Sequence, residues 1–168
     1  IYEPGFLRTG QGNPFSVFTP FKRRWIENFD MNFLDIVQPN IAKKPTQVKS
    51  DLSNLQFIKT HSANIRLWPA GEEAAQEKLA SFLQLKAKSY SNSRNFPIID
   101  GTSRISPYLA LGILSPKRCI LEGLKLNNFE FTSGNKGICK WIDEIVWREF
   151  YRNIMYAFPK VSQNQPFQ

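Results

Sequence analysis

The sequence contains few of the residues that form disulfides, metal centres and membrane spans. Its 168 residues include only two cysteines, Cys119 and Cys139, and a single histidine, His61. Two cysteines so far apart provide neither a zinc cluster nor a disulfide framework, so we interpret them as buried thiols of an intracellular protein. With one histidine, the chain can assemble neither a histidine metal site nor a Ser-His triad, and no metal site is predicted.

Long apolar runs are also absent. No stretch approaches the roughly 20 apolar residues that cross a bilayer, and the N-terminus lacks the basic region and apolar core of a signal peptide. We therefore expect a cytoplasmic protein without membrane contact. The sequence starts at Ile1 rather than at a methionine and stops in residues 163–168, where no helix or strand is completed, so we expect a piece of a longer protein.

Positive charge, by contrast, is abundant. There are 22 Lys and Arg residues against 14 Asp and Glu, which gives a formal net charge of +8, and 42% of the residues are hydrophobic. This apolar content is enough for one ordinary domain, or for a domain and the remnant of another. The excess charge favours a polyanionic partner such as nucleic acid but does not prove one.

The first third of the sequence contains one predicted helix. Residues 1–18 are punctuated by Gly and Pro and end in a short apolar stretch, which predicts a loop and then a short strand or extended segment. Thr19 and Pro20 suit an N-cap and a first helical turn, so a short amphipathic helix is expected over residues 20–30. Residues 36–66 show no sustained period, and we interpret them as an interdomain linker.

The rest of the sequence predicts helices alone. Acidic residues after Gly71 mark a helix start, and an apolar stripe follows them at Ala75, Leu79, Phe82 and Leu83. Two Ser-Pro pairs predict helices near residues 107–112 and 116–126, because Ser is a good N-cap and Pro suits the first turn. A long helix is expected over residues 136–158. No strand pattern follows residue 70, so this second domain is expected to be all-helical.

The most informative loop is a hydroxyl-rich run at residues 101–106. It gathers three hydroxyls, one guanidinium and several backbone N–H groups where a helix is predicted to begin, and a helix N-terminus favours phosphate oxygens. The run is therefore a candidate cradle for a diphosphate. In the alternative interpretation Ser106 only caps a helix, Thr102 forms a turn and Arg104 is solvated.

A second candidate surface lies on the long predicted helix. Helical spacing gathers two indoles, a phenol, an acid and two guanidinium groups along one side and its flank, at Trp141, Glu144, Trp147, Arg148, Tyr151 and Arg152. Such a surface suits stacking on a flat ring or base, with the arginines meeting phosphates. The alternative is an amphipathic helix whose tryptophans are core and whose charges pair with one another in solvent.

In their order and spacing, these motifs resemble the DNA photolyase and cryptochrome family, and the bacterial cyclobutane pyrimidine dimer photolyases in particular. The segments that carry the resemblance are Tyr90, Arg94, residues 101–106, residues 112–116 and residues 141–152. Residues 15–22 are similar to the last part of the family's N-terminal antenna domain. The resemblance therefore covers nearly the whole chain except the linker.

The resemblance implies a mainly α fold in three parts. Residues 1–35 would be the C-terminal end of an α/β antenna domain, residues 36–66 the linker, and residues 67–168 the N-terminal part of the helical FAD-binding domain. The family's nucleotide-binding fold and its tryptophan chain for photoreduction would lie outside this chain. An antenna chromophore, often of folate type, cannot be assigned, and the chain alone is expected to be inactive.

The resemblance also implies a flavin enzyme, a deoxyribodipyrimidine photolyase that acts as a monomer on DNA containing pyrimidine dimers. Excited FAD, in its reduced anionic state, would give one electron to the dimer, whose cyclobutane ring then splits before the electron returns. The residues expected to hold FAD are Tyr90, Thr102, Ser103, Arg104, Ile105, Ser106, Trp141 and Arg148. Those expected to contact DNA are Arg94, Glu144, Trp147, Arg148, Tyr151 and Arg152.

Two of these residues are the expected catalytic pair. Glu144 would accept hydrogen bonds from the flipped pyrimidines, and Trp147 would stack on them. Both suit a base pocket, so they favour repair over a cryptochrome-like blue-light receptor with the same flavin site. A flavin-free basic helical module that binds nucleic acid is the alternative from another class, and a colourless protein would identify it.

Overall fold

The computed structural model describes residues 1–34 and 67–167. Within these two ranges the regular structure is helical and no strand occurs, which confirms the predicted mainly α fold. The helices are α1 (Phe18–Glu27), η1 (Met31–Leu34), α2 (Glu72–Leu85), η3 (Ala87–Ser89), α3 (Tyr90–Ser93), α4 (Ser106–Ala110), α5 (Pro116–Leu126), α6 (Lys136–Ala157) and η4 (Pro159–Gln163). The predicted linker over residues 36–66, with His61, lies outside the described residues.

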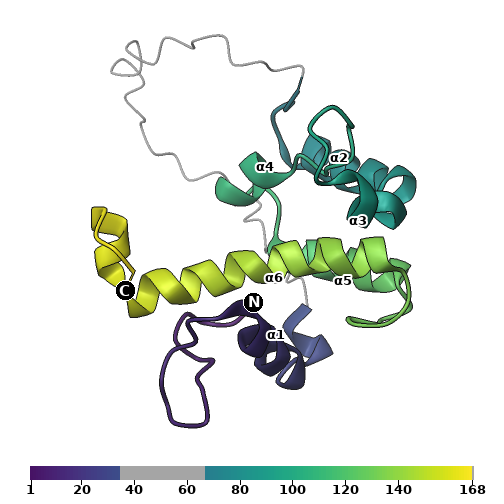
Figure 1. Ribbon diagram of the computed structural model, residues 1–168. Helices are drawn as coiled ribbons and strands as arrows, with labels where there is room; N and C mark the ends of the chain where they lie inside the picture. Colours follow the sequence, from purple (N-terminus) through teal and green to yellow (C-terminus); the bar gives the residue numbers. More distant parts are fainter. Residues whose placement is uncertain (35–66, 168) are drawn as a thin grey trace, which may run out of the picture.

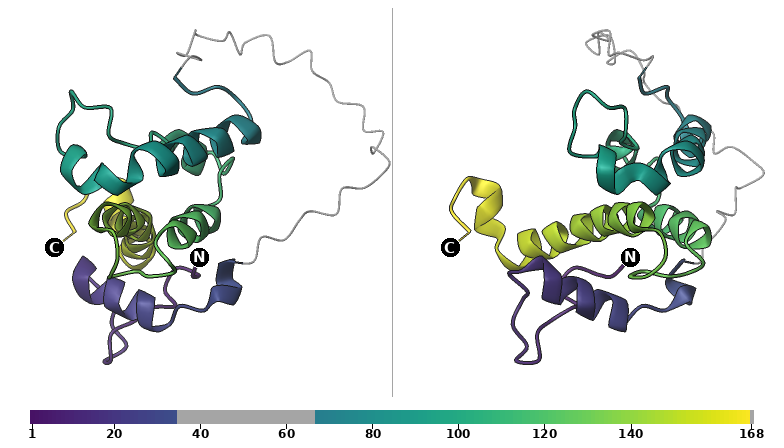
Figure 2. Two further views of the ribbon diagram at one scale, coloured as in Figure 1. Left: turned by 90° about the vertical axis from the view of Figure 1, so that its right-hand side faces the viewer. Right: turned by 45° about the vertical axis from the view of Figure 1, so that its right-hand side comes forward.

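Helix α6 is the centre of the fold. α1 lies along one side of α6, α2 and α3 lie on the opposite side, and α5 runs beside it (Figures 1 and 2). Buried positions recur along α6 at three- and four-residue spacing, at Ile138, Trp141, Ile142, Ile145, Val146, Glu149, Phe150, Asn153 and Ile154. Because these residues cover more than one face of the helix, α6 packs against neighbours on several sides.

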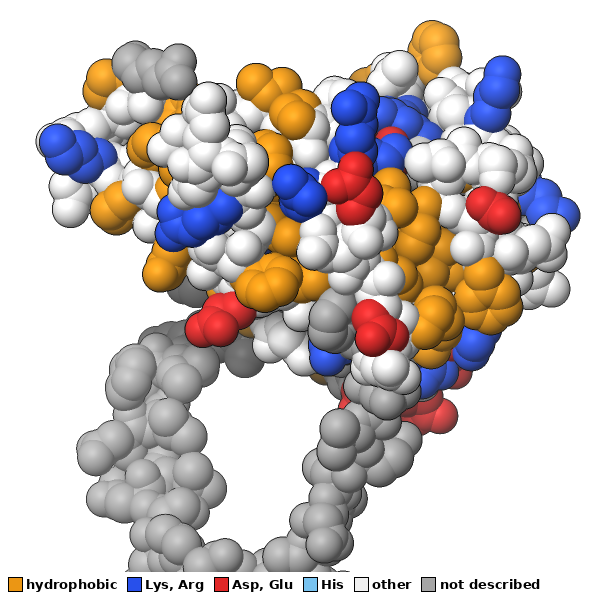
Figure 3. Space-filling model, turned by 90° about the horizontal axis from the view of Figure 1, so that it is seen from below, with side chains coloured by type: hydrophobic (Ala, Val, Ile, Leu, Met, Phe, Trp, Pro, Cys, Tyr) orange, Lys and Arg blue, Asp and Glu red, His pale blue; other side chains and the backbone are white. Residues whose placement is uncertain are grey.

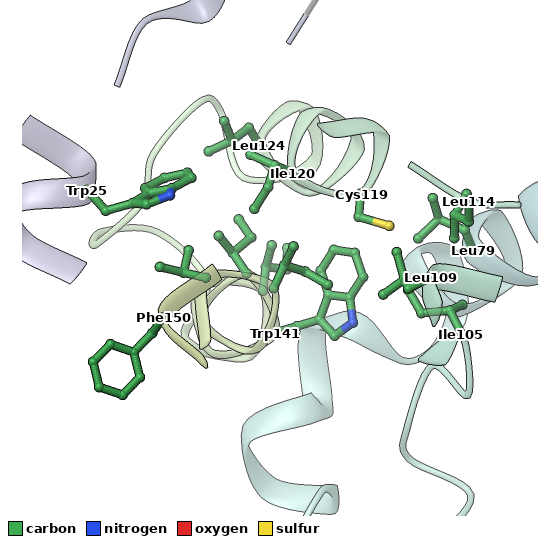
Figure 4. Packing of buried hydrophobic residues seen from close by; sticks show 14 of the residues in the cluster. Trp25, Leu79, Ile105, Leu109, Leu114, Cys119, Ile120, Leu124, Trp141 and Phe150 are labelled. Atoms are coloured by element: carbon green, nitrogen blue, oxygen red, sulfur yellow. The ribbon is translucent and has the colours of Figure 1, made fainter. Parts of the chain in front are cut away.

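A single apolar core joins the N-terminal segment to the rest of the chain. Phe21 and Trp25 of α1 are fully buried and belong to the same cluster as Trp141 and Ile120. Figure 4 shows α6 between Trp25 on one side and the residues around Leu109 on the other. Burying side chains of this size stabilises a fold by about 1.5–3 kcal/mol each, so α1 is held firmly on α6.

The two cysteines differ in their surroundings. Cys119 lies in the core beside Trp141 (Figure 4), whereas Cys139 is only partly buried. Burial raises the pKa of the Cys119 thiol to about 12, although the positive charge of Arg148 opposes this shift. Cys119 is therefore a neutral thiol and is buried, as the sequence predicted, whereas Cys139 departs from the prediction of burial.

Two predicted helix caps are wrong. α1 begins at Phe18, two residues earlier than expected, so Thr19 lies in the first turn and Val17 is the N-cap without a side-chain hydrogen bond. Ser106 was also predicted to be an N-cap, but it is the first residue of α4, and Ile105 takes the N-cap position. The side chains of Phe18 and Ile105 both pack against the core, and this packing outweighs the local preference for a hydroxyl cap.

The start of α6 is set by a polar loop. The Asn135 side chain accepts hydrogen bonds from the backbone N–H groups of Gly137 and Ile138, at 2.9 and 3.1 Å, and so caps the helix. The buried side chain of Asn127 donates to the carbonyl of Ser133 at 2.8 Å and accepts from the N–H of Asn135 at 2.8 Å. These bonds fix the direction in which α6 leaves the loop.

Gly137 allows the first turn of α6 to lie directly against η3. A Cβ atom at this position would overlap with the backbone carbonyl oxygens of Ala87 and Lys88, which cannot rotate away. We expect Gly137→Ala to lower the free energy of unfolding by about 1–3 kcal/mol, the usual cost of overpacking. Urea unfolding of the full-length protein measures the loss. Lys136→Ala, at the exposed neighbouring position, is the control, and an equal effect of both changes would contradict this account.

Candidate functional site

A pocket of about 650 Å³ opens between the hydroxyl-rich run and α6. Twelve of the residues predicted from the sequence line it, namely Tyr90, Thr102, Ser103, Arg104, Ile105, Ser106, Trp141, Glu144, Trp147, Arg148, Tyr151 and Arg152. Four further lining residues were not predicted and are apolar: Leu109, Ala110, Ile145 and Met155. The structure therefore brings the two predicted constellations together, and the volume falls in the range of small-molecule and cofactor sites.

The backbone of the hydroxyl-rich run is shaped to receive an anion. Arg104 has a left-handed backbone with φ 52°, and Ile105 next to it is right-handed helical. Consecutive residues of opposite hand can turn their N–H groups toward one point, so Arg104 and Ile105 form a candidate anion-binding nest. The left-handed conformation strains a residue that carries a Cβ, and such strain is typical of functional sites.

The surroundings of Arg104 hold this conformation in place. Its carbonyl accepts a hydrogen bond of 2.8 Å from the indole Nε1 of Trp68, and its guanidinium lies 3.0 Å from the Asp100 carboxylate. A hydrogen bond from Lys86, together with the charges of Lys86 and Arg104, keeps the pKa of Asp100 below its ordinary value. Asp100 is therefore ionised at neutral pH and can pair with Arg104, but both side chains are largely exposed, so this pair adds little stability.

The helix behind the run contributes less than the sequence suggested. α4 has five residues, so its dipole is small and the nest and the hydroxyls carry the anion-binding character of this wall. Gly101 packs directly against α3, because a Cβ atom at this position would overlap with the side chain of Ser93 at the end of α3. Close packing on α3 thus sets where the run enters the pocket.

The opposite wall belongs to α6. Trp141 is 2% exposed and packs against Phe82 at a ring-centroid distance of 5.3 Å, so it is a core residue that also lines the pocket. Further along the helix Tyr151 is 57% exposed. Both alternatives read from the sequence are therefore partly correct: one tryptophan is core, while the surface along the helix faces a cavity.

Glu144 is the single acid among the residues that line this pocket, and the same lining includes three arginines. Its carboxylate pairs with the guanidinium of Arg94, which comes from the end of α3. Arg94 also lies over the ring of Tyr90, 5.7 Å from the ring centroid. Burial and the negative charge of Glu144 raise the pKa of Tyr90, so its phenol stays neutral. Arg94 does not line the pocket, but it forms an ion pair with Glu144, which does.

The remaining arginines share a carboxylate that the sequence analysis did not single out. Glu149 is 2% exposed, and its Oε1 lies 3.1 Å from Arg152 and 4.0 Å from Arg148. It follows Ile142 by seven residues, so helical periodicity could have placed it on the buried face. Glu149 lies behind the pocket and orients two of the cations that line it.

The basic residues of α1 form no such site. Lys22 lies 2.6 Å from Asp143 on α6, and Arg24 lies 3.4 Å from Glu27 on its own helix. On the side of the molecule where α1 lies, Lys and Arg side chains are scattered among apolar and neutral ones (Figure 3). Lys22 thus holds α1 on α6, whereas Arg24 pairs within its own helix near the surface.

Two kinds of feature are absent from the part of the chain that the structure describes. No helix among residues 1–34 and 67–167 is long and apolar enough to cross a membrane. In the same ranges, no three His, Cys, Asp or Glu side chains gather in a group that could hold a metal ion.

Deoxyribodipyrimidine photolyases are among the known proteins whose sequences are similar to this one. The chain is 33% identical to the deoxyribodipyrimidine photolyase of Salmonella typhimurium over 168 residues, which cover 99% of this chain and 35% of that protein. It is 32% identical to the enzyme of the same name from Neurospora crassa over 187 residues, which cover 99% of this chain and 30% of that protein. A scan against models of protein families gives no match.

The fold points the same way. The crystal structure of a bacterial class III photolyase from Agrobacterium tumefaciens superimposes with a TM-score of 0.74 and 30% sequence identity, over 95% of this chain and 34% of that one. The chain thus spans about a third of the length of the relatives it matches. Sequence, fold and the order of the site motifs agree, and the chain belongs to the DNA photolyase and cryptochrome family.

Proposed function

We propose that this chain is part of a deoxyribodipyrimidine photolyase, a flavoprotein that splits cyclobutane pyrimidine dimers in DNA with light. The observation that carries the proposal is the pocket itself, where an anion-binding nest on one wall faces indoles, a carboxylate and arginines on the other. A cofactor with a diphosphate and a flat ring needs the first wall, and a flipped base needs the second. The names of the similar proteins support the same activity.

The residues of the pocket fit FAD. The nest at Arg104 and Ile105, with the hydroxyls of Thr102, Ser103 and Ser106, would bind the diphosphate, and Arg148 would add a positive charge. The apolar surface of Ile105, Leu109, Trp141 and Ile145 would contact the rings, and the neutral phenol of Tyr90 would add a hydrogen-bond donor. When bound in its reduced anionic form, FAD would supply the light-driven electron transfer that opens the cyclobutane ring. An antenna chromophore is not assigned.

The same pocket would receive the damaged DNA. Glu144 would accept hydrogen bonds from the flipped pyrimidines while Trp147 stacks on them. Arg94, with Arg148, Tyr151 and Arg152, would contact the strand around the lesion, where guanidinium groups bind phosphates well. Because Arg94 pairs with Glu144 in the structure, a phosphate that attracts Arg94 would also free the carboxylate for the bases.

Further features of the whole protein belong to the same proposal. We assign residues 1–35 to the end of an antenna domain and residues 67–168 to the start of the FAD-binding domain, joined by residues 36–66. The packing of α1 on α6 means that these two parts would share an interface. A monomeric state and a cytoplasmic location stay predictions.

The nest makes a specific prediction about Arg104. Arg104→Gly should leave the flavin content nearly unchanged, since glycine adopts the left-handed conformation without strain and the guanidinium is engaged by Asp100. Arg104→Val should lower it, because a β-branched residue at positive φ costs at least about 1–2 kcal/mol and would flatten the nest. The ratio of flavin to protein absorbance in purified full-length protein measures both. Equal loss in the two variants would show that the side chain, not the backbone, holds the cofactor.

The proposed function is tested by two measurements on the full-length protein. We expect the visible absorption spectrum of bound flavin and light-dependent loss of dimers from ultraviolet-irradiated DNA. Bound flavin without repair would indicate a cryptochrome-like receptor. A colourless protein that still binds DNA would indicate a flavin-free basic helical module, and either result would reject the proposal.

A further inference from the structure

The N-terminal segment reaches the candidate site through one aromatic ring. Phe18, the first residue of α1, stacks on the indole of Trp147 with a centroid distance of 3.7 Å and an interplanar angle of 8°. Trp147 lines the pocket, whereas Phe18 is not among its lining residues. Phe18 therefore covers indole surface that is turned away from the cavity.

The position of Phe18 is itself fixed by α1. Phe21 and Trp25, later on the same helix, are fully buried, and Lys22 lies 2.6 Å from Asp143 on α6. The apolar contacts and the ion pair together leave α1 little freedom to slide or rotate on α6. The ring of Phe18, at the first residue of α1, is thus held at a defined distance from α6.

The indole of Trp147 is enclosed by rings on further sides. Phe150 meets it edge to face at 5.5 Å, and Tyr151 lies at 5.4 Å with an interplanar angle of 27°. Phe150 also contacts Phe18 edge to face at 5.9 Å. Phe18, Trp147 and Phe150 therefore pack as a cluster in which each ring limits the rotamers of the others.

We propose that Phe18 is a positioning residue for Trp147. Its ring holds the indole in one orientation before substrate arrives, so that a flipped base meets a preformed stacking surface and less side-chain freedom is lost on binding. This inference rests on the proposed function, because it assumes that Trp147 stacks on the lesion. It adds that selectivity for damaged DNA depends on a residue of the segment assigned to the neighbouring domain.

The test compares Phe18→Leu, which keeps an apolar side chain but removes the ring, with Phe18→Tyr, which keeps the ring. In the full-length protein, Phe18→Leu should lower the ratio of affinities for dimer-containing and undamaged duplex about three- to tenfold, the range expected for the loss of one ring–ring contact. Phe18→Tyr should retain most of the affinity ratio of the unaltered protein. The near-ultraviolet circular dichroism of Trp147, taken as the difference from a Trp147→Phe protein, should weaken in the first variant and persist in the second.

A second background separates positioning from general stability. In a Trp147→Ala protein, Phe18→Leu should change the affinity ratio much less, because no ring is left at this position to orient. An equal effect in both backgrounds, or an unchanged ratio and dichroism in a folded Phe18→Leu protein, would overturn the inference. If the unaltered protein has no preference for damaged DNA, the proposed function fails instead, and the dichroism still decides whether Phe18 orients Trp147.

Discussion

Trp147→Ala in the full-length protein is expected to weaken binding to dimer-containing DNA about ten- to hundredfold, with little change in affinity for undamaged duplex. A base stacked on an aromatic ring gains about 1–3 kcal/mol, and about 1.4 kcal/mol corresponds to a factor of ten. Binding to undamaged DNA depends mainly on contacts between cations and phosphates, which carry no information about the lesion. Its salt dependence should therefore stay the same.

The packing of Trp147 requires a control for stability. The indole is partly buried against Phe18 and Phe150, so its removal also opens a gap behind the pocket wall. Trp147→Phe keeps a ring in this cluster and should retain more of the selectivity than Trp147→Ala. Both DNA affinities and the flavin content are measured on the same preparation. An unchanged affinity ratio in Trp147→Ala protein that retains its flavin would exclude the stacking role.

Local sequence signals predicted where the helices lie and which residues of α6 line the candidate pocket. The predicted helices over residues 116–126 and 136–158 correspond to α5 (Pro116–Leu126) and α6 (Lys136–Ala157), because Ser-Pro pairs and 3.6-residue periodicity act within one segment. The periodicity also placed Trp141, Glu144 and Trp147 around one side of α6, where all three line the pocket.

Contacts between distant segments were beyond such signals. The stack of Phe18 on Trp147 joins residues 129 positions apart, and the partner of Glu144 turned out to be Arg94, fifty positions away. Neither follows from helical spacing, because both depend on how α1 and α3 pack on α6. The left-handed backbone of Arg104 was equally hidden, since that conformation is usual for glycine and here depends on contacts to Trp68 and Asp100.

Glu149 is a buried acid of α6 whose loss should destabilise the protein. Its Oε2 accepts a hydrogen bond from the backbone N–H of Tyr2 at 3.2 Å, while Oε1 accepts one from Arg152 at 3.1 Å. One turn later, Asn153 accepts from the N–H of Gly5 at 2.8 Å. These two side chains of α6 thus provide the acceptors for the N-terminal segment.

We expect Glu149→Ala to lower the free energy of unfolding of the full-length protein by about 2–4 kcal/mol. The substitution removes the acceptor of a buried backbone N–H, leaves a cavity, and takes away the negative charge that Arg148 and Arg152 share. Glu149→Gln keeps the volume and one acceptor oxygen, so it should lose less than half as much. Urea unfolding followed by tryptophan fluorescence measures both variants. Because Arg148 and Arg152 line the pocket, Glu149→Ala should also lower the flavin content of the protein. Full stability in this variant would contradict the prediction and would show that residues 1–5 do not depend on α6 for their position.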